Sequence, residues 1–388
     1  MKILKTLAIE TSCDDTSVGI ISFDGNKFEV DKLLAYSQIN DHQKYGGVVP
    51  EIASRLHFEK IIAVLENITW EKIEKVDFVS VTTHPGLPGS LVVGKAVAKM
   101  ISSFFNKPLI EANHIYGHIF SLFLERNIKD IKFPMVVLTA SGGHNDLYLI
   151  KKLKDGKIKR LKIKEQKISF DFEIEKIGYT LDDAAGECFD KVARMLGGPY
   201  PGGIWISQKA QLFKKDNAKL KAIQKNGIRL IFKRIFLSKD KFEFSFSGMK
   251  SQVSFLLKQL EKKGIKLNSN IINKIAYEFQ EAVIEVLAKK LIKAGKKYKA
   301  KTISIAGGVS ANERLWEFLN QEIKKLKDGK IKRLKINNKK IKSFESVKSF
   351  EKKELFNLQL LRPSNKIYST DNAAMIGVYG IINKMKNE

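Results

Sequence analysis

One short pattern, an apolar strand followed by a polar turn and a second apolar strand, occurs twice in this chain of 388 residues. The first copy places residues 4–9 and 18–23 on either side of the turn ETSCDDTS. The second places residues 135–139 and 146–150 on either side of the turn SGGH at 141–144. Hydroxyls and backbone amides at such a tip can face a phosphate, although either turn alone is also compatible with an ordinary polar loop. The duplication predicts an α/β protein with two lobes, each contributing one hairpin to a nucleotide-binding cleft.

A second feature is a pair of histidines, His114 and His118, in the stretch NHIYGH. We expect a helix that begins at Asn113 with this residue as its N-cap, and the spacing then puts both imidazoles on one face, within reach of one metal ion. Such pairs also occur as ordinary surface or core residues, so the spacing alone leaves both interpretations open. An HExxH metalloprotease is disfavoured, because Ile115 stands where the glutamate that activates water would be.

Length and composition limit the class of protein. A chain of 388 residues exceeds one typical core and favours two domains. No apolar run reaches the roughly 18–20 residues of a membrane span, and the start MKILKTLAIETSCDD does not resemble a signal peptide. Cys13 and Cys188 make no disulfide framework, and the absence of a CxxC pair excludes a zinc ribbon. We therefore expect a cytoplasmic protein that does not associate with membranes.

The net charge of +27 favours a polyanionic partner, of which nucleic acid is the commonest. More than half of this charge lies in residues 151–164 and 324–342, two windows that both contain the segment KKLKDGKIKRLKI. Two interpretations stay open for these windows. They are either solvated lysine-rich hairpins, since Asp-Gly is a strong turn signal, or surfaces in direct contact with a nucleic acid.

Hydrophobic periodicity places the remaining elements. One further helix is expected to begin at Leu181 and to carry acidic residues near its N-terminal half, namely Asp182, Asp183, Glu187 and Asp190. Asp371 stands at the start of the C-terminal helix. The other predicted helices cover residues 52–65, 92–105, 272–293 and 313–323, and the other predicted strands cover residues 78–82, 108–111 and 302–306.

Eight short motifs follow one another in a fixed order: ETSCDDTS, HxxxH, SGGH, DDAAGExFDK, YPGG, FSFSGxK, GGVSAN and TDNAAM. As an ordered set they resemble the tRNA N6-adenosine threonylcarbamoyltransferase family, and YGGVVPEIASR resembles its bacterial branch. The resemblance extends from Ile9 to Gly377, apart from the two lysine-rich segments.

The resemblance implies the actin/Hsp70/sugar-kinase fold, with two RNase-H-like lobes around a central nucleotide cleft. The first lobe would comprise residues 1–112, completed by the C-terminal helix 371–388. The second would comprise residues 113–370, with lysine-rich insertions near 151–177 and 324–356. The implied activity is transfer of the threonylcarbamoyl group from threonylcarbamoyl-AMP to N6 of adenosine 37, in tRNAs that read codons beginning with A.

The same resemblance assigns residues to this reaction. The metal ligands would be His114, His118 and Asp371, around one divalent ion, with Fe²⁺ preferred and Zn²⁺ as the alternative. Asp14 would act near the reacting carbonyl. The adenylate would be held at its phosphate, ribose and adenine by Thr139, Ala140, Ser141, Gly142, Gly143, Asp190, Gly203 and Asn312.

Departures from the family pattern and implied partners complete the prediction. Thr139-Ala140 replaces the commoner Leu-Val before SGG, and His84 replaces a glycine, most simply as a tolerated loop residue.

Expected partners are tRNA, a motif-poor paralogue that forms a heterodimer, and a small ATPase. Two alternatives are a small-molecule kinase with the same fold and a non-catalytic tRNA-binding subunit of the modification complex. The kinase would explain the phosphate hairpins but not the set His114, His118 and Asp371. A non-catalytic subunit would be expected to have lost metal or phosphate residues, and none is lost here.

Overall fold

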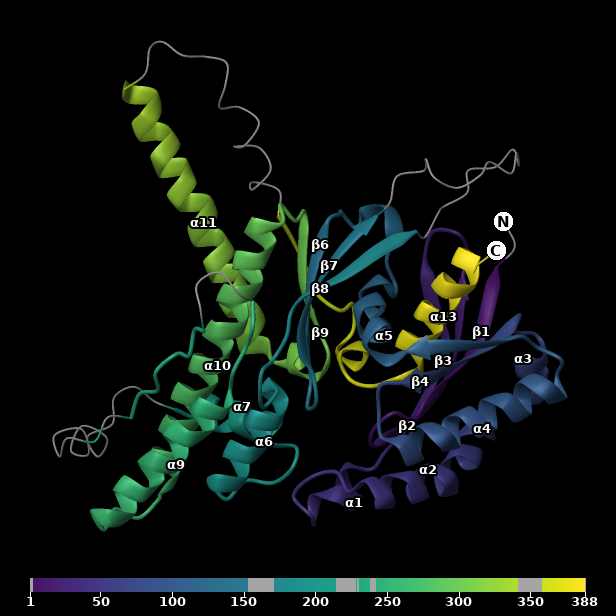
Figure 1. The fold of residues 1–388 in the computed structure, drawn as a ribbon, viewed down its shortest axis with the longest axis horizontal. Helices are drawn as coiled ribbons and strands as arrows, with labels where there is room; N and C mark the ends of the chain where they lie inside the picture. Colours follow the sequence, from purple (N-terminus) through teal and green to yellow (C-terminus); the bar gives the residue numbers. More distant parts are fainter. Residues whose placement is uncertain are drawn as a thin grey trace.

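The computed structural model describes residues 3–152, 171–213, 228, 230–237, 242–340 and 358–387, as two lobes side by side (Figure 1). Most of the first lysine-rich segment, and the end of the second, lie outside the described residues. Among the described residues, no helix is both long and apolar enough to cross a membrane.

The first lobe is built on a five-stranded sheet in the order β3-β2-β1-β4-β5. β2 is antiparallel to β1 and β3, whereas β4 and β5 run parallel to β1. Alternate residues of β1 face opposite sides of the sheet and belong to two different cores. Leu7 and Ile9 belong to the core under α2 and α4, and Ala8 belongs to the core under α13. The strands are β1 (Leu4–Glu10), β2 (Asp15–Phe23), β3 (Phe28–Ser37), β4 (Phe78–His84) and β5 (Leu109–Asn113).

The second lobe repeats this topology. Its sheet has the order β10-β9-β6-β7-β8, which is the order of the first sheet read from the other edge. β7 is antiparallel to β6 and β8, and β9 is parallel to both β6 and β10. The duplicated hairpins therefore confirm the predicted two-lobed α/β fold. The strands are β6 (Met135–Ala140), β7 (Asn145–Lys152), β8 (Phe172–Gly178), β9 (Thr302–Ala306) and β10 (Gln359–Leu361).

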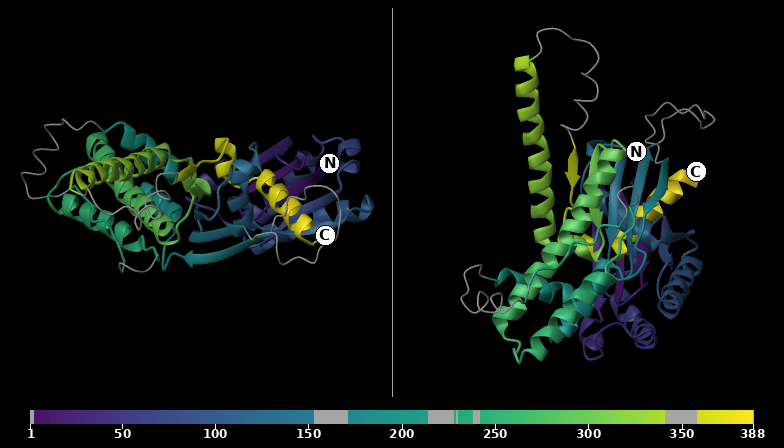
Figure 2. Two further views of the ribbon diagram at one scale, coloured as in Figure 1. Left: turned by 90° about the horizontal axis from the view of Figure 1, so that it is seen from above. Right: turned by 60° about the vertical axis from the view of Figure 1, so that its left-hand side comes forward.

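Helices cover both sheets and join the lobes. α5 and α13 share one hydrophobic core with residues of both sheets, and α13 packs along β1 and β2 (Figure 2). The second lobe carries α6, α7, α9, α10 and α11 on its other side. The helices are α1 (Ile39–Gln43), α2 (Pro50–Leu65), α3 (Trp70–Glu74), α4 (Pro88–Phe104), α5 (His114–Phe120), α6 (Ala185–Met195), α7 (Gly202–Gln211), α9 (Ser247–Lys262), α10 (Ser269–Lys297), α11 (Glu313–Lys340) and α13 (Ala373–Asn387).

Three of the differences between the sequence predictions and the structure have a clear physical reason. α4 begins at Pro88 instead of residue 92, because proline fits the first helical position, where its missing N–H costs nothing. α6 begins at Ala185 instead of Leu181, because the Asp182 carboxylate accepts N–H groups at the start of α9 instead. α11 continues past Asp328-Gly329, where a hairpin turn was one interpretation. Its first turns are fixed by packing of Leu315 and Leu319 in the core, and a helix already nucleated tolerates one glycine at about 1 kcal/mol.

Candidate metal and nucleotide site

The histidine pair lies on α5 as the sequence predicts. The side chain of Asn113 caps this helix by accepting the N–H of Tyr116 at 3.0 Å. Both imidazoles are buried, with ring centroids 4.7 Å apart. The spacing of four residues therefore does bring them onto one face of the helix.

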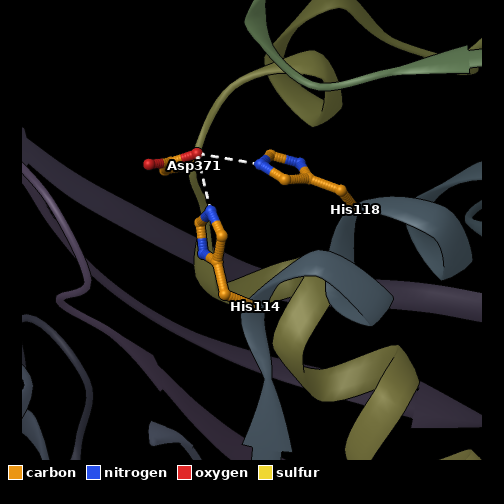
Figure 3. A group of neighbouring side chains, drawn as sticks. All are labelled: His114, His118 and Asp371. Carbon is orange, nitrogen blue, oxygen red and sulfur yellow. Dashed lines mark ion pairs between the residues drawn. The ribbon is translucent and has the colours of Figure 1, made fainter. Parts of the chain in front are cut away.

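Asp371 reaches the pair from the other end of the chain (Figure 3). Its Oδ1 lies 3.0 Å from Nε2 of His118 and 3.7 Å from Nε2 of His114. Close packing of α5 on α13 makes this possible, since a Cβ on Gly117 would lie 2.9 Å from Cδ1 of Ile376. A side chain at position 117 would therefore require at least the Ile376 side chain on α13 to move.

These three side chains fit a single divalent ion. One ligand atom from each lies within 4.8 Å of the others, as expected of donors that share an ion at about 2.0–2.2 Å from each. The buried Nδ1 of His118 has no hydrogen-bond partner among the described groups, and its Nε2 faces Asp371 Oδ1 at 3.0 Å. Two imidazoles and one carboxylate leave further coordination positions open, as a catalytic ion requires.

The turn after β6 is open where a phosphate would approach. Its ends are tied together, since Ser141 N–H donates to the His144 carbonyl at 2.9 Å and Ser141 Oγ accepts the His144 N–H. Gly142 and Gly143 are exposed, and a Cβ on either would meet nothing within 4 Å, so the tip of the turn is uncrowded. Thr139 and Ala140 are buried within β6, and the Thr139 hydroxyl donates to the Asp146 carbonyl. These two residues can therefore contribute backbone but not side-chain contacts.

Asp190 on α6 faces the turn that precedes α7. Its Oδ1 accepts the N–H of Gly202 at 2.6 Å. Burial raises the pKa of Asp190 to about 6, against the lowering effect of the Gly202 and Gly203 amides. A Cβ on Gly203 would lie 3.9 Å from Phe189, so Gly203 is beside Asp190 without being crowded.

Asp14 connects the two lobes. The Tyr200 hydroxyl, from the turn before α7, donates to Asp14 Oδ2 at 3.2 Å. Burial and the negative charge of Asp371 raise the pKa of Asp14, and Asp14 in turn raises that of Asp190. The predicted catalytic, metal and ribose residues thus share one electrostatic environment.

Asn312 is placed differently from the other predicted residues. Its Oδ1 accepts the N–H of Leu315 in the first turn of α11, and its Nδ2 donates to Gln280 at 3.0 Å. Both ends of the side chain are therefore engaged in holding α11 against α10.

The profile of one protein family, described as tRNA N6-adenosine threonylcarbamoyltransferase, matches residues 31–378. The chain belongs to this family. Proteins of that name support the assignment over most of the sequence. The one from Syntrophomonas wolfei is 40% identical over 321 residues, covering 82% of this chain and 83% of its own. The one from Thermosipho africanus is 37% identical over 379 residues, covering 96% and 92%.

Membership of the threonylcarbamoyltransferase family makes the chain an enzyme, a transferase of tRNA threonylcarbamoyladenosine modification. Among solved structures, HypF of T. kodakarensis aligns with 99% of this chain and 47% of its own length, at a TM-score of 0.52 and 10% sequence identity. That likeness concerns the fold alone, and it agrees with two lobes of the actin/Hsp70/sugar-kinase type.

Glu10, at the end of β1, was not predicted as part of the threonylcarbamoyltransferase site. Its buried carboxylate accepts the Thr82 hydroxyl at 2.5 Å and lies 3.3 Å from Nδ1 of His114, the nitrogen turned away from Asp371. Ser12 Oγ lies 2.9 Å from the same nitrogen. A carboxylate behind a histidine ligand fixes the orientation of the ring and strengthens it as a donor. The signal was an acidic residue at the end of a buried strand, beside the polar turn.

Replacing Glu10 by glutamine should lower the affinity for the divalent metal by about 10- to 100-fold, because the amide would orient His114 without the carboxylate charge. Isothermal titration of the metal-stripped protein with Fe²⁺ or Zn²⁺ measures this change. Glu111→Gln, at an exposed position of β5, removes the same charge elsewhere and serves as the control. Equal metal affinities for the two variants would show that Glu10 does not support the ligand.

Proposed function

We propose that this chain transfers the threonylcarbamoyl group from threonylcarbamoyl-AMP to N6 of adenosine 37, in tRNAs that read codons beginning with A. The observation that supports this most directly is the convergence of His114, His118 and Asp371 beside the uncrowded turn at 141–144, whose His144 interacts electrostatically with all three. A metal-binding group next to a phosphate-binding turn suits an activated acyl phosphate better than it suits a simple hydroxyl substrate.

In this proposal the described residues offer counterparts for the phosphate and the ribose of the adenylate. The amides of Gly142 and Gly143 would hold the phosphate, because backbone N–H groups in a turn form an anion-binding concavity. Asp190 would accept the ribose hydroxyls, with Gly203 beside it. Asn312 would lie on the adenine side of the cleft without forming a hydrogen bond to the base, since its own polar atoms are engaged by residues of α10 and α11.

His114, His118 and Asp371 would hold the metal, whose Lewis acidity polarises a carbonyl oxygen. Imidazole and carboxylate donors suit Fe²⁺, which we prefer, and Zn²⁺. The N6 amine of adenosine attacks the threonylcarbamoyl carbonyl and the new C–N bond forms. The bond to the phosphate oxygen breaks, AMP leaves with that electron pair, and N6 releases one proton to solvent. Asp14 is placed to act near that carbonyl, and binding both substrates in one geometry supplies much of the rate.

In this proposal the protein works with a motif-poor paralogue and a small ATPase, and it uses an adenylate made by a separate synthase. The direct test combines the purified chain, these partners, unmodified tRNA and threonylcarbamoyl-AMP, with mass spectrometry of the nucleosides. The proposal expects threonylcarbamoyladenosine to accumulate and AMP to be released in equal amount. ATP consumption with a small-molecule acceptor and no modified nucleoside would favour the kinase alternative.

The affinity for the adenylate should fall as the pH decreases through about 6, because Asp190 must be ionised to accept two ribose hydroxyls and burial raises its pKa to about 6. The affinity for the adenylate should be highest at pH values above the pKa of Asp190 and should be lost at pH values below it. Calorimetric titration with AMP between pH 5 and 8 measures the effect. Asp190→Asn should bind AMP more weakly than the wild type at pH 8, approach the wild-type affinity at pH 5, and lose the part of the pH dependence that Asp190 contributes. A wild-type affinity that is constant down to pH 5 would contradict the assignment.

A further inference from the structure

The outward face of α9 carries a basic depression with an exposed aromatic ring. The depression has a volume of about 280 Å³ and is formed by α9 and the end of α6, with the lining residues Met195, Lys250, Ser251, Ser254, Phe255 and Lys258. Phe255 is 63% exposed although it is a large apolar side chain. None of these residues takes part in the transfer chemistry described above.

The helical period explains why these groups lie together. Ser251, Phe255, Lys258 and Lys262 follow one another at intervals of four, three and four residues, which places them on one face of α9. α9 contains three lysines and one carboxylate, Glu261, so its charge is positive. Lys250 is anchored by an ion pair of 2.9 Å with Asp183, which fixes the edge of the depression next to α6.

This depression lies close to the proposed adenylate site. Gly186 at the start of α6 donates its N–H to the carbonyl of Ser141, in the turn at 141–144 that would bind the phosphate. Met195 at the other end of α6 lines the depression. Nine residues of helix separate the two, roughly 14 Å. α6 and α9 are packed side by side (Figure 1), so a substrate strand that delivers one nucleotide to the turn can extend over α9.

We propose that the α9 depression binds single-stranded nucleotides that flank the acceptor adenosine of tRNA, which rests on the proposed function. One base stacks on the ring of Phe255, and the backbone phosphates contact Lys258. Unpaired bases of RNA loops are commonly held by stacking on aromatic side chains within a basic groove. Phenylalanine and methionine are also common at protein interfaces, but lysine and serine are depleted there, so the two lysines and two serines of the lining favour RNA over a protein partner.

The test compares tRNA binding by Phe255→Ala, Phe255→Trp and Lys258→Gln with that of the wild-type chain. Phe255→Ala should weaken binding of an unmodified anticodon stem–loop by roughly 5- to 100-fold, the effect of losing one stacked base. Phe255→Trp should retain the affinity, because the larger ring still stacks. Lys258→Gln should reduce the slope of log affinity against log salt by about 0.7–0.9, as expected for one phosphate contact.

Matched measurements separate this inference from the proposed function. Lys75→Gln removes an equal charge from an exposed position next to α3, at the far end of the molecule (Figure 1), and should leave the stem–loop affinity unchanged. All variants should bind AMP like the wild type. If the wild type modifies tRNA but Phe255→Ala binds the stem–loop equally well, the inference is wrong and the proposed function stands. Loss of partner-subunit binding without loss of RNA affinity would also overturn it. A wild-type chain that neither binds nor modifies tRNA overturns both.

Discussion

Asp371→Ala and His118→Ala are expected to abolish threonylcarbamoyl transfer, because each removes one of three ligands that converge on the proposed metal position. Metal Lewis acidity is worth several kcal/mol in a transition state, which corresponds to a rate loss of about a thousand-fold or more. Elemental analysis of the purified variants should show that bound metal is lost together with activity. The transfer rate is measured with unmodified tRNA, threonylcarbamoyl-AMP and the partner proteins.

His84→Ala provides the control for the loss of a histidine. His84 is exposed at the end of β4, where its Nδ1 contacts only the neighbouring Thr83 hydroxyl among the described groups. This variant should keep its metal and most of its activity. Full activity of both Asp371→Ala and His118→Ala under metal-free conditions would show that the reaction does not depend on this ion.

Gly186→Ala is expected to weaken adenylate binding by about 100-fold or more while α6 itself remains folded. A Cβ at this position would lie 2.5 Å from the carbonyl oxygen of Ser141 and 2.8 Å from the nitrogen of Gly142. Both are backbone atoms of the turn at 141–143, so this turn must shift. If it binds the phosphate as we propose, the displaced turn loses its hydrogen bonds to that phosphate. Titration with AMP measures the affinity, and thermal unfolding measures the stability.

Gly295→Ala is the matched control, because it makes the same substitution in α10 against a core side chain. Its Cβ would lie 2.7 Å from Cγ2 of Ile303, which costs about 1–3 kcal/mol of stability by overpacking. The control should therefore unfold at a lower temperature than the wild type and still bind AMP normally. If Gly186→Ala also binds AMP normally, then the turn at 141–143 does not hold the phosphate.

The fold was largely predictable from local sequence, because its main signals repeat. Apolar strands on either side of a polar turn occur at residues 4–23 and 135–150, and each became the antiparallel hairpin that begins a sheet. Alternation along a strand reports which residues are buried whatever the strand packs against. The hairpin interpretation of Asp328-Gly329 was wrong because packing elsewhere in the element overrode the local signal. A two-residue turn signal is weaker than a helix already fixed by packing of Leu315 and Leu319.

The sequence by itself determined that His114 and His118 share a face, because four residues make about one helical turn. Asp371 was assigned by resemblance alone, and only the packing of α5 on α13 at Gly117 brings its carboxylate within 3.0 Å of His118. Glu10 at the end of a buried strand was visible in the sequence, but neither its place behind His114 nor that of Gly186 beneath the turn at 141–143 was, since each acts on a residue distant in the chain. Local periodicity fixes the direction of a side chain within its own element, whereas contacts between distant elements depend on how closely their backbones pack.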